Sequence, residues 1–200
     1  MNKFALVPAA IVAATAFATP AAAQIAPSGP RVELQAGWDF LRDQEDFGAE
    51  YENDGGMIGV GAGYDIGLGA VALGFDVELS KSDIEDSAAY TDGDAYVDAI
   101  LDSGREIYVG GRATIPIGLR TDVFVKAGYA NLETELDLLF DDGVDTFREV
   151  IREREDGVRV GAGVNYKLVG GAYLGGEYRF TSYDSDIDKH QLVASLGLRF

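Results

Sequence analysis

The sequence predicts an all-β protein whose strands close into an eight-stranded antiparallel barrel. Two observations carry this prediction. Apolar residues alternate with polar or small residues along eight runs of about ten residues, which is the period of a β-strand. The connections between these runs alternate strictly between long and short. An even number of such strands, with tight turns at one end, fits an up-and-down barrel better than a sandwich.

The first 23 residues are expected to form a cleaved secretory signal peptide. Lys3 supplies a positive charge, residues 4–18 form an apolar run, and Ala21 and Ala23 match the small-x-small rule for cleavage after Ala23. The alternative, an amino-terminal membrane anchor, needs an apolar run of about 20 residues. We therefore expect a short lead at residues 24–30 and one barrel domain at residues 31–200.

The eight predicted strands follow one another with the same alternation. In the second run, for example, Ile58, Val60 and Ala62 alternate with Gly59 and Gly61. The runs cover residues 32–40, 58–66, 71–79, 105–115, 121–130, 158–168, 172–180 and 192–200. Phe124, which falls among the polar positions of the fifth run, is its one exception.

The connections indicate how the barrel is placed. The long connections are residues 41–56, 81–104, 131–156 and 182–188, and the short ones are residues 67–69, 116–120 and 169–170. Tight turns at one end and long loops at the other are typical of transmembrane β-barrels, whereas a soluble sandwich has no reason to sort its loops. The sequence thus predicts short periplasmic turns and long extracellular loops.

The charges indicate which face meets lipid. No apolar run carries a charge, and the opposite positions hold a predicted lumen charge network: Asp76, Glu78, Arg112, Lys126, Arg159, Lys167, Glu177 and Arg179. A soluble barrel such as a lipocalin would place the two faces the other way round, and alternation alone does not distinguish them. Nearly balanced charges favour a lumen closed by ion pairs.

The aromatic residues favour the membrane orientation. They fall near strand ends, where interfacial girdles form in membrane barrels, and Phe75 is a mid-strand exception. The predicted upper girdle is Trp38, Phe40, Tyr129, Tyr178 and Phe180, and the lower girdle is Tyr64, Tyr166 and Phe200. The 26 glycines leave room inside a narrow barrel for long side chains, so we expect a plugged lumen and not a channel.

Four segments resemble a known family. VFVKAGY at residues 123–129, DGVRVGAGVNYKL at 156–168, LGGEYRF at 174–180 and LVASLGLRF at 192–200 are similar to strands of the outer-membrane β-barrel domain family, the opacity-protein and small porin-like group. The resemblance implies an outer-membrane location in a Gram-negative bacterium and no shared catalytic set. It also implies that the terminal Phe200 is a signal read by the barrel-insertion machinery.

Composition excludes several classes of function. The formal charge of −18 argues against nucleic acid as a partner. The absence of cysteine excludes disulfides and thiolate metal sites, and a single histidine leaves little for zinc, so no cofactor is expected. For catalysis, His190 would need one of Ser182, Ser185 or Ser195 within reach, but no motif links them, and a rim histidine is the simpler interpretation.

Most of the acidity lies in the long loops, which contain 26 of the 34 acids and five of the 16 bases. Asp92, Asp94 and Asp98, and Asp137, Asp141 and Asp142, resemble loose divalent-cation sites without the spacing of a calcium loop, so a solvated acidic surface is the alternative. Residues 131–156 are predicted to form a projecting hairpin, with a short helix at 145–155 as the alternative, and residues 90–96 a similar turn.

These features predict a non-enzymatic outer-membrane protein whose acidic loops serve an envelope, adhesion or interaction role. Outer-membrane lipid, the insertion machinery, a surface protein and divalent cations are the expected partners. A small-solute porin is the alternative function, and a lipid-modifying enzyme is a weaker one.

Overall fold

The computed structural model describes residues 25–43, 51–83, 85–92, 95–141, 146–184 and 187–200. At residues 42–43, 51–53, 85–92, 95–104, 134–141, 146–153 and 187 it describes the backbone alone. All regular elements in these ranges are strands: β1 (Gly29–Asp43), β2 (Tyr51–Gly67), β3 (Ala72–Ser82), β4 (Glu85–Asp92), β5 (Ala95–Pro116), β6 (Thr121–Asp141), β7 (Thr146–Lys167), β8 (Ala172–Tyr183) and β9 (Ile187–Arg199).

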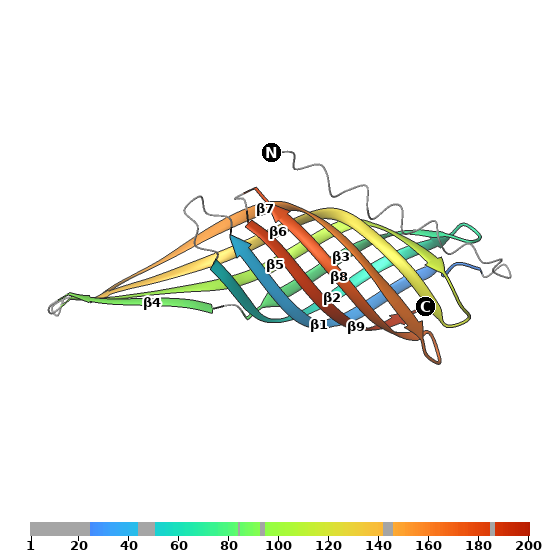
Figure 1. Cartoon of the computed structure of the whole chain (residues 1–200), viewed down its shortest axis with the longest axis horizontal. Coiled ribbons are helices and arrows are strands. Elements are labelled where there is room, and N and C mark those ends of the chain that lie inside the picture. The colour runs from blue at the N-terminus through green and yellow to red at the C-terminus, as the bar shows by residue number, and fades with distance from the viewer. Residues whose placement is uncertain (1–24, 44–50, 84, 93–94, 142–145, 185–186) are drawn as a thin grey trace.

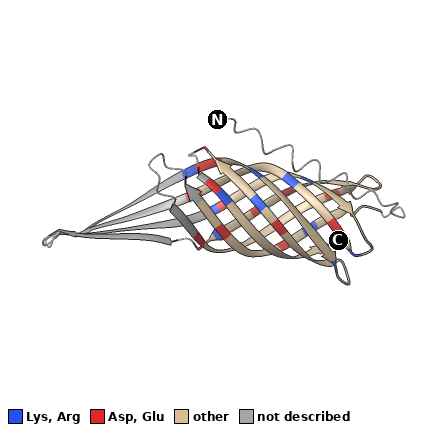
Figure 2. Cartoon of the chain, viewed as in Figure 1, with Lys and Arg blue, Asp and Glu red and all other residues tan. Residues whose placement is uncertain are grey.

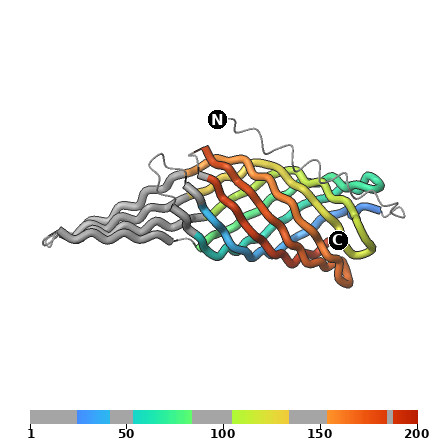
Figure 3. The backbone as a smooth tube through the Cα atoms, viewed as in Figure 1, coloured from blue at the N-terminus to red at the C-terminus, as the bar shows by residue number. Residues whose placement is uncertain are grey.

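Eight of these strands close into a barrel (Figure 1). The order of neighbours is β3-β2-β1-β9-β8-β7-β6-β5, every pair is antiparallel, and pairing of β3 with β5 closes the ring. The first and last barrel strands lie side by side, since Arg31 on β1 is opposite Arg199 on β9 (Figure 3). The predicted eight-stranded antiparallel barrel is therefore confirmed. β4 pairs only with the outer part of β5 and does not belong to the ring.

The register sends the polar positions inward and the apolar positions outward. Along β3 the side chains alternate strictly, with Asp76 and Glu78 buried while Phe75, Val77 and Leu79 are exposed. Successive side chains of a strand point to opposite faces, so a one-residue slip would bring the charges to the outside. The core of this molecule is polar and its outer surface is apolar, which is the inverse of a soluble barrel.

Tight turns join the strands at one end of the barrel, at residues 68–71, 117–120 and 168–171. In the first turn, the Leu68 amide donates to the Val71 carbonyl at 2.7 Å and Gly69 has a φ of 82°. Gly170 and Gly171 have φ values of 71° and 83° in the third turn. These are left-handed conformations that glycine adopts without a steric penalty.

The strands extend further at the other end than the alternation predicted. β6 and β7 remain paired from Thr121 opposite Tyr166 to Asp141 opposite Thr146, so residues 131–141 and 146–156 form the two strands of the predicted hairpin and not a helix. β4 and β5 likewise pair up to Asp92 opposite Ala95. The sequence signal is weaker here because acidic residues stand at many positions of both parities. β4 and the outer parts of β5, β6 and β7 form a four-stranded sheet that projects beyond the barrel (Figure 1).

The described part of the lead packs under the turn end of the barrel. The Ala26 amide donates to the Gly69 carbonyl at 2.8 Å, and the Ser28 hydroxyl donates to the Asp65 carbonyl at 3.2 Å. The expected signal peptide, residues 1–23, lies outside the described residues. Within the described ranges, no helix is long and apolar enough to cross a bilayer.

Candidate functional site

Charged side chains fill the barrel interior along its length, and acidic and basic positions are interspersed on the barrel strands (Figure 2). The buried charged residues among the described side chains are Arg31, Glu33, Asp39, Asp65, Asp76, Glu78, Glu106, Arg112, Asp122, Lys126, Arg159, Arg179 and Lys189. A buried charge is costly unless it is paired and hydrogen-bonded. The geometry of the pairs therefore decides whether this lumen is a packed plug.

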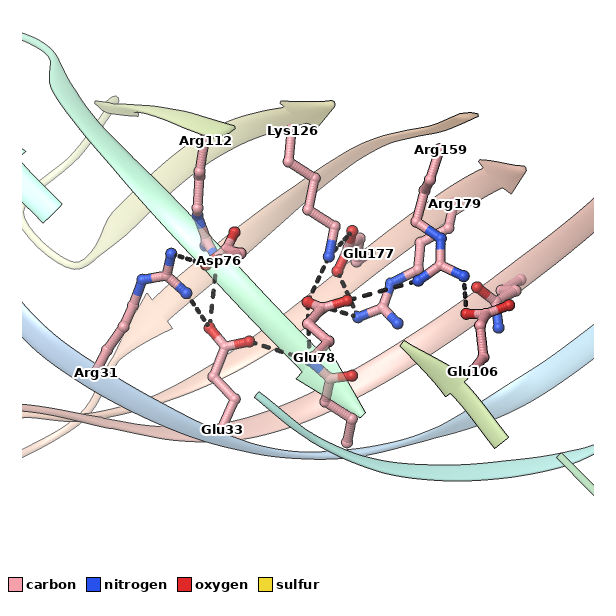
Figure 4. Close-up of polar contacts among 12 residues, drawn as sticks. Arg31, Glu33, Asp76, Glu78, Glu106, Arg112, Lys126, Arg159, Glu177 and Arg179 are labelled. Atoms are coloured by element: carbon pink, nitrogen blue, oxygen red, sulfur yellow. Dashed lines mark hydrogen bonds and ion pairs between the residues drawn. The ribbon is translucent and has the colours of Figure 1, made fainter. Parts of the chain in front are cut away.

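At the turn end, Arg31 binds three carboxylates. Its guanidinium pairs with Asp76 and lies 3.4 Å from Glu33 (Figure 4), and it also lies 3.0 Å from Asp65. Glu33 also accepts from Arg112 at 3.3 Å. The fork of donors on Arg31 joins strands β1, β2 and β3 across the lumen, as suits a planar guanidinium.

Glu78 is the centre of the network. Its carboxylate lies 2.6 Å from the Lys126 amine, 3.4 Å from the Arg179 guanidinium and 3.7 Å from the Arg159 guanidinium (Figure 4). A second acid, Glu177, lies 2.7 Å from Lys126 and 3.0 Å from Arg179. Two acids and three bases from β3, β6, β7 and β8 thus lock together at mid-barrel.

Toward the other end, Glu106 and Asp39 continue the network. Glu106 pairs with Arg159 and lies 3.3 Å from the Lys189 amine, which in turn lies 2.7 Å from Asp39. Gln191 donates to Asp39 at 2.9 Å. The chain of contacts from Arg31 to Lys189 includes residues of every barrel strand and crosses the lumen repeatedly along the barrel.

The structure brings together seven of the eight predicted lumen residues: Asp76, Glu78, Arg112, Lys126, Arg159, Glu177 and Arg179. Lys167 lies apart from this network, where it pairs with Asp122 at 2.8 Å near the turn end. The sequence reasoning did not single out Arg31 and Lys189. Both residues stand at lumen-facing positions of their strands, one or two residues beyond the stretches that were considered. Extending the predicted alternation that far would have identified them.

Tyrosines and glycines complete the packing. The Tyr173 hydroxyl donates to Glu33 at 2.7 Å, and the Tyr183 hydroxyl donates to Glu106. A Cβ at Gly197 would collide with the ring of Tyr173. Glycine at that position is therefore needed for space, as the composition suggested.

Phe124, the exception to the alternation, also belongs to the lumen. Its ring is buried, and the guanidinium carbon of Arg112 lies 3.6 Å from the ring centroid. A guanidinium stacked on an aromatic face is stabilised by the electrostatics of the ring. An apolar residue at a lumen position is thus matched to a neighbouring cation.

The outer surface carries the predicted girdle residues. Trp38 donates to Asp54 at 2.8 Å and Tyr129 donates to Asp156, both on the side of the projecting sheet. The other half-exposed or exposed positions of the predicted girdles are Phe40, Tyr64, Tyr166, Tyr178, Phe180 and Phe200. The Phe200 amide donates to the Pro30 carbonyl at 3.0 Å, which holds the carboxyl end against β1.

His190 lies among aromatic rings on the outer face. Its Nδ1 is 2.6 Å from the Tyr178 hydroxyl, and its ring centroid is 5.1 Å from that of Phe180. Ser195 has the opposite parity on the same strand, and Ser185 lies outside the described residues. The described contacts do not bring a serine and an acid together around this imidazole.

The candidate divalent-cation residues are not placed by the structure. Asp94 and Asp142 lie outside the described residues, and at Asp92, Asp98, Asp137 and Asp141 the backbone alone is described. Among the described side chains, no cluster of three His, Cys, Asp or Glu residues has a geometry that would hold a metal ion. The diffuse cation sites remain a prediction.

The comparisons with known proteins agree with this architecture. The family described as the outer membrane protein beta-barrel domain matches residues 9–200. The chain belongs to this family. The protein is therefore an outer-membrane β-barrel protein. No curated protein sequence matches the chain.

Solved structures share the fold at low sequence identity. A crystal structure of Ail, the attachment invasion locus protein of Yersinia pestis, matches with a TM-score of 0.53 and 12% identity, covering 87% of this chain and 100% of Ail. Ail in complex with the heparin analogue sucrose octasulfate matches with a TM-score of 0.51 and 12% identity, covering 86% and 99%. Neisserial surface protein A matches with a TM-score of 0.47 and 15% identity, covering 84% and 97%.

Proposed function

We propose that this outer-membrane barrel is a non-enzymatic surface-interaction protein, and that its projecting sheet binds a basic protein partner. The observation that carries the proposal is that the projecting sheet has two unpaired strand edges. β8 ends at Tyr183, opposite Gly157 of β7, and the Asp184 amide donates to the Asp156 carbonyl at 2.9 Å, so within the described part of the chain residues 146–155 of β7 pair only with β6. β4 pairs only with β5. Two strand edges thus leave backbone groups available for an added strand.

The chemistry of the sheet favours a basic partner. Its residues, 85–92, 95–104, 134–141 and 146–156, contain twelve acids and three bases. A partner of the same charge sign as the sheet is repelled, whereas a partner of opposite charge associates faster. Ail, which shares the fold, was crystallised with a sulfated sugar, but an acidic sheet would repel such a ligand, so we propose the opposite charge for the partner here.

The register also provides apolar positions. Val97, Phe140 and Phe147 stand in one cross-strand row of β5, β6 and β7, and Leu136 and Ile151 stand opposite each other further down. Positions an even number of residues apart on a strand belong to the same face. The sheet thus offers a partner both acidic side chains and one more apolar face.

The filled lumen supports this proposal over a small-solute pore. Eight strands enclose an interior just wide enough for side chains, and here they are ion-paired from Arg31 to Lys189. A lipid-modifying role lacks support for a different reason, because the described contacts of the His190 imidazole are with aromatic rings and a tyrosine hydroxyl.

A binding assay tests the proposal. The refolded barrel would be titrated with a basic, strand-forming peptide of alternating Lys and Val, and with a matched peptide of alternating Glu and Val. A trimmed barrel, in which residues 85–103 and 134–154 are replaced by short turns, is the control, and its folding is checked by heat-modifiable migration on a gel. We expect at least tenfold tighter binding of the Lys peptide to the full barrel. Equal affinity for both peptides, or for both barrels, would contradict the proposal.

Divalent cations are a proposed second partner. The acidic loops stand above a leaflet that is itself commonly anionic, and carboxylates supply the hard oxygen ligands that Ca²⁺ and Mg²⁺ prefer, at about 10⁻⁴–10⁻³ M for loose sites. Binding of the barrel to anionic lipid would be measured with and without millimolar calcium, alongside a variant with the acids of residues 131–156 neutralised. An identical result in all four cases would remove this proposal.

A further inference from the structure

The two edges of the projecting sheet differ in composition. Within the described part of the chain, β4 forms one edge and pairs only with β5, and residues 146–155 of β7 form the other and pair only with β6 (Figure 1). The register matches positions at the two edges. Ser87 of β4, for example, leads through Ile100 and Asp137 to Val150 of β7. The edges can therefore be compared position by position.

The β7 edge is rich in charges of both signs. Six of its ten residues are charged, with arginines at even-numbered and glutamates at odd-numbered positions: Arg148, Arg152 and Arg154, and Glu149, Glu153 and Glu155. Charged side chains along an edge strand are a common means by which proteins prevent strand addition. Like charges at opposed positions also destabilise a sheet, so the three arginines would repel a basic strand.

The β4 edge has the opposite character. It contains no basic residue, and its middle, SAAYT at residues 87–91, is uncharged. Its three acids stand toward the two ends of the strand: Glu85, Asp86 and Asp92. Backbone groups in the middle of such an edge are not protected by charge, and a basic strand is attracted at both ends.

One face of β4 has a symmetric pattern. Positions 86, 88, 90 and 92 belong to the same face and read Asp, Ala, Tyr, Asp. Val97, Phe140 and Phe147 form an apolar row across β5, β6 and β7. Tyr90 stands opposite Val97 and so extends this row to the edge of the sheet. A strand added at β4 would continue the row with its own residue opposite Tyr90.

We propose that β4 is the edge that receives the basic partner, and that the partner strand carries two basic residues six positions apart with two apolar residues between them on the same face. The basic residues stand opposite Asp86 and Asp92, and the apolar residues stand opposite Ala88 and Tyr90. Directly opposed side chains are the pairs that stabilise a sheet. The pattern of acids and apolar residues on β4 is the same in both directions, so it does not require one direction of the added strand.

The β4 site rests on the proposed function, because it assigns the edge and the residue pattern of the same basic partner. The proposed function requires only that the acidic sheet prefers a basic strand. The β4 site requires in addition that the order of residues in that strand matters and that the strand attaches at one edge alone. The two can therefore fail separately.

Two peptides of identical composition and charge test the pattern. Lys-Thr-Val-Thr-Val-Thr-Lys has the proposed order, and Val-Thr-Lys-Thr-Lys-Thr-Val exchanges the basic and apolar positions. We expect the first peptide to bind the refolded barrel about tenfold tighter, since each of two opposed charge pairs contributes about threefold. Asp86→Asn with Asp92→Asn should remove this difference. The matched control is Asp98→Asn with Asp137→Asn, which removes the same charge from the inner strands β5 and β6 and should preserve the difference.

Single cysteines locate the added strand. The chain has no cysteine, so Ala89→Cys in the middle of β4 and Val150→Cys on the same face at the β7 edge each introduce one thiol. A peptide of the proposed order with cysteine at its central position should form a disulfide with the β4 variant at least tenfold faster than with the β7 variant. Heat-modifiable migration verifies that each variant folds.

The outcomes separate the β4 site from the proposed function. Equal affinity for the two Lys peptides, or equally fast cross-linking at both edges, would overturn the β4 site and leave the preference for a basic partner standing. If neither Lys peptide binds more tightly than Glu-Thr-Val-Thr-Val-Thr-Glu, the proposed function itself fails and the β4 site fails with it.

Discussion

Replacing Glu78 with Gln should destabilise the barrel more than any single loop substitution. Glu78 is 3% exposed, and its carboxylate faces Lys126, Arg159 and Arg179 at 2.6, 3.7 and 3.4 Å. The substitution keeps the shape of the side chain and removes its charge. Three buried cations then lose a shared negative partner.

The expected loss of unfolding free energy depends on the acidic partners that each cation keeps. Breaking a buried ion pair by removing one partner costs about 3–5 kcal/mol. Lys126 and Arg179 still contact Glu177, and Arg159 still contacts Glu106, so the loss should lie at the lower end of this range, about 3 kcal/mol. With a denaturant slope of about 2 kcal/mol per molar urea, the unfolding midpoint should fall by about 1.5 M.

The measurement is reversible urea unfolding of the barrel in lipid vesicles, followed by the fluorescence of Trp38. The control is Glu155→Gln on β7, because Glu155 is a half-buried acid at the barrel rim with no described ion pair. Its midpoint should move by less than about 0.5 M. A shift in Glu78→Gln no larger than in this control would refute the reasoning, since it would mean that water and not Glu78 balances the cations.

The remaining predictions concern the faces, the lumen and the rim. Val160→Asp puts a charge on the lipid face and should cost up to about 2 kcal/mol in the same assay, whereas Asn165→Asp in the lumen should be tolerated; equal tolerance would invert the two faces. Planar-bilayer recordings should show negligible conductance, and stable nanosiemens steps would favour the pore. At the rim, a hydrogen bond from Arg154, aided by the charge of Arg105, holds the pKa of Glu133 below its usual 4.5. The contribution of Glu133 to the free energy of unfolding is therefore present above pH 4.5 and is lost as the pH falls through the lowered pKa. Glu133→Gln should remove this part of the dependence of stability on pH. An unchanged pH profile of the unfolding midpoint would show that the pairing of Glu133 with the two arginines does not stabilise the barrel.

The fold was readable from the sequence because a membrane barrel repeats one simple rule. One face of each strand contacts lipid and the other faces the lumen, so apolar and polar residues alternate along the whole membrane-spanning part of the strand. The paired register of β1 with β9, from Arg31 opposite Arg199, follows the parity that the sequence predicted. The tight turns were equally visible, since residues near Gly69 and Gly170 must reverse the chain within a few positions.

The projecting sheet was only partly readable. Beyond the membrane neither face needs to be uniformly apolar, so the parity signal weakens in β4 and in the outer parts of β5, β6 and β7. The hairpin of residues 131–156 was predicted from the inward parity of Leu132, Leu136 and Phe140, but its pairing with the outer part of β5 was not. These pairings join strands that are consecutive in the sequence, but beyond the bilayer no regular alternation marks how far each strand extends.

The sequence by itself determined that this chain alternates between two environments, which residues face each of them, and that the lumen charges nearly balance. Only the tertiary structure decided which charge meets which. Glu78 contacts bases from three strands, and Arg31 contacts acids from its own strand and two others, because strand tilt and stagger set their heights in the lumen. The same geometry placed Lys81 opposite Arg105 on the outer wall. A one-dimensional pattern gives each side chain its face, but its neighbours depend on the register around the whole ring.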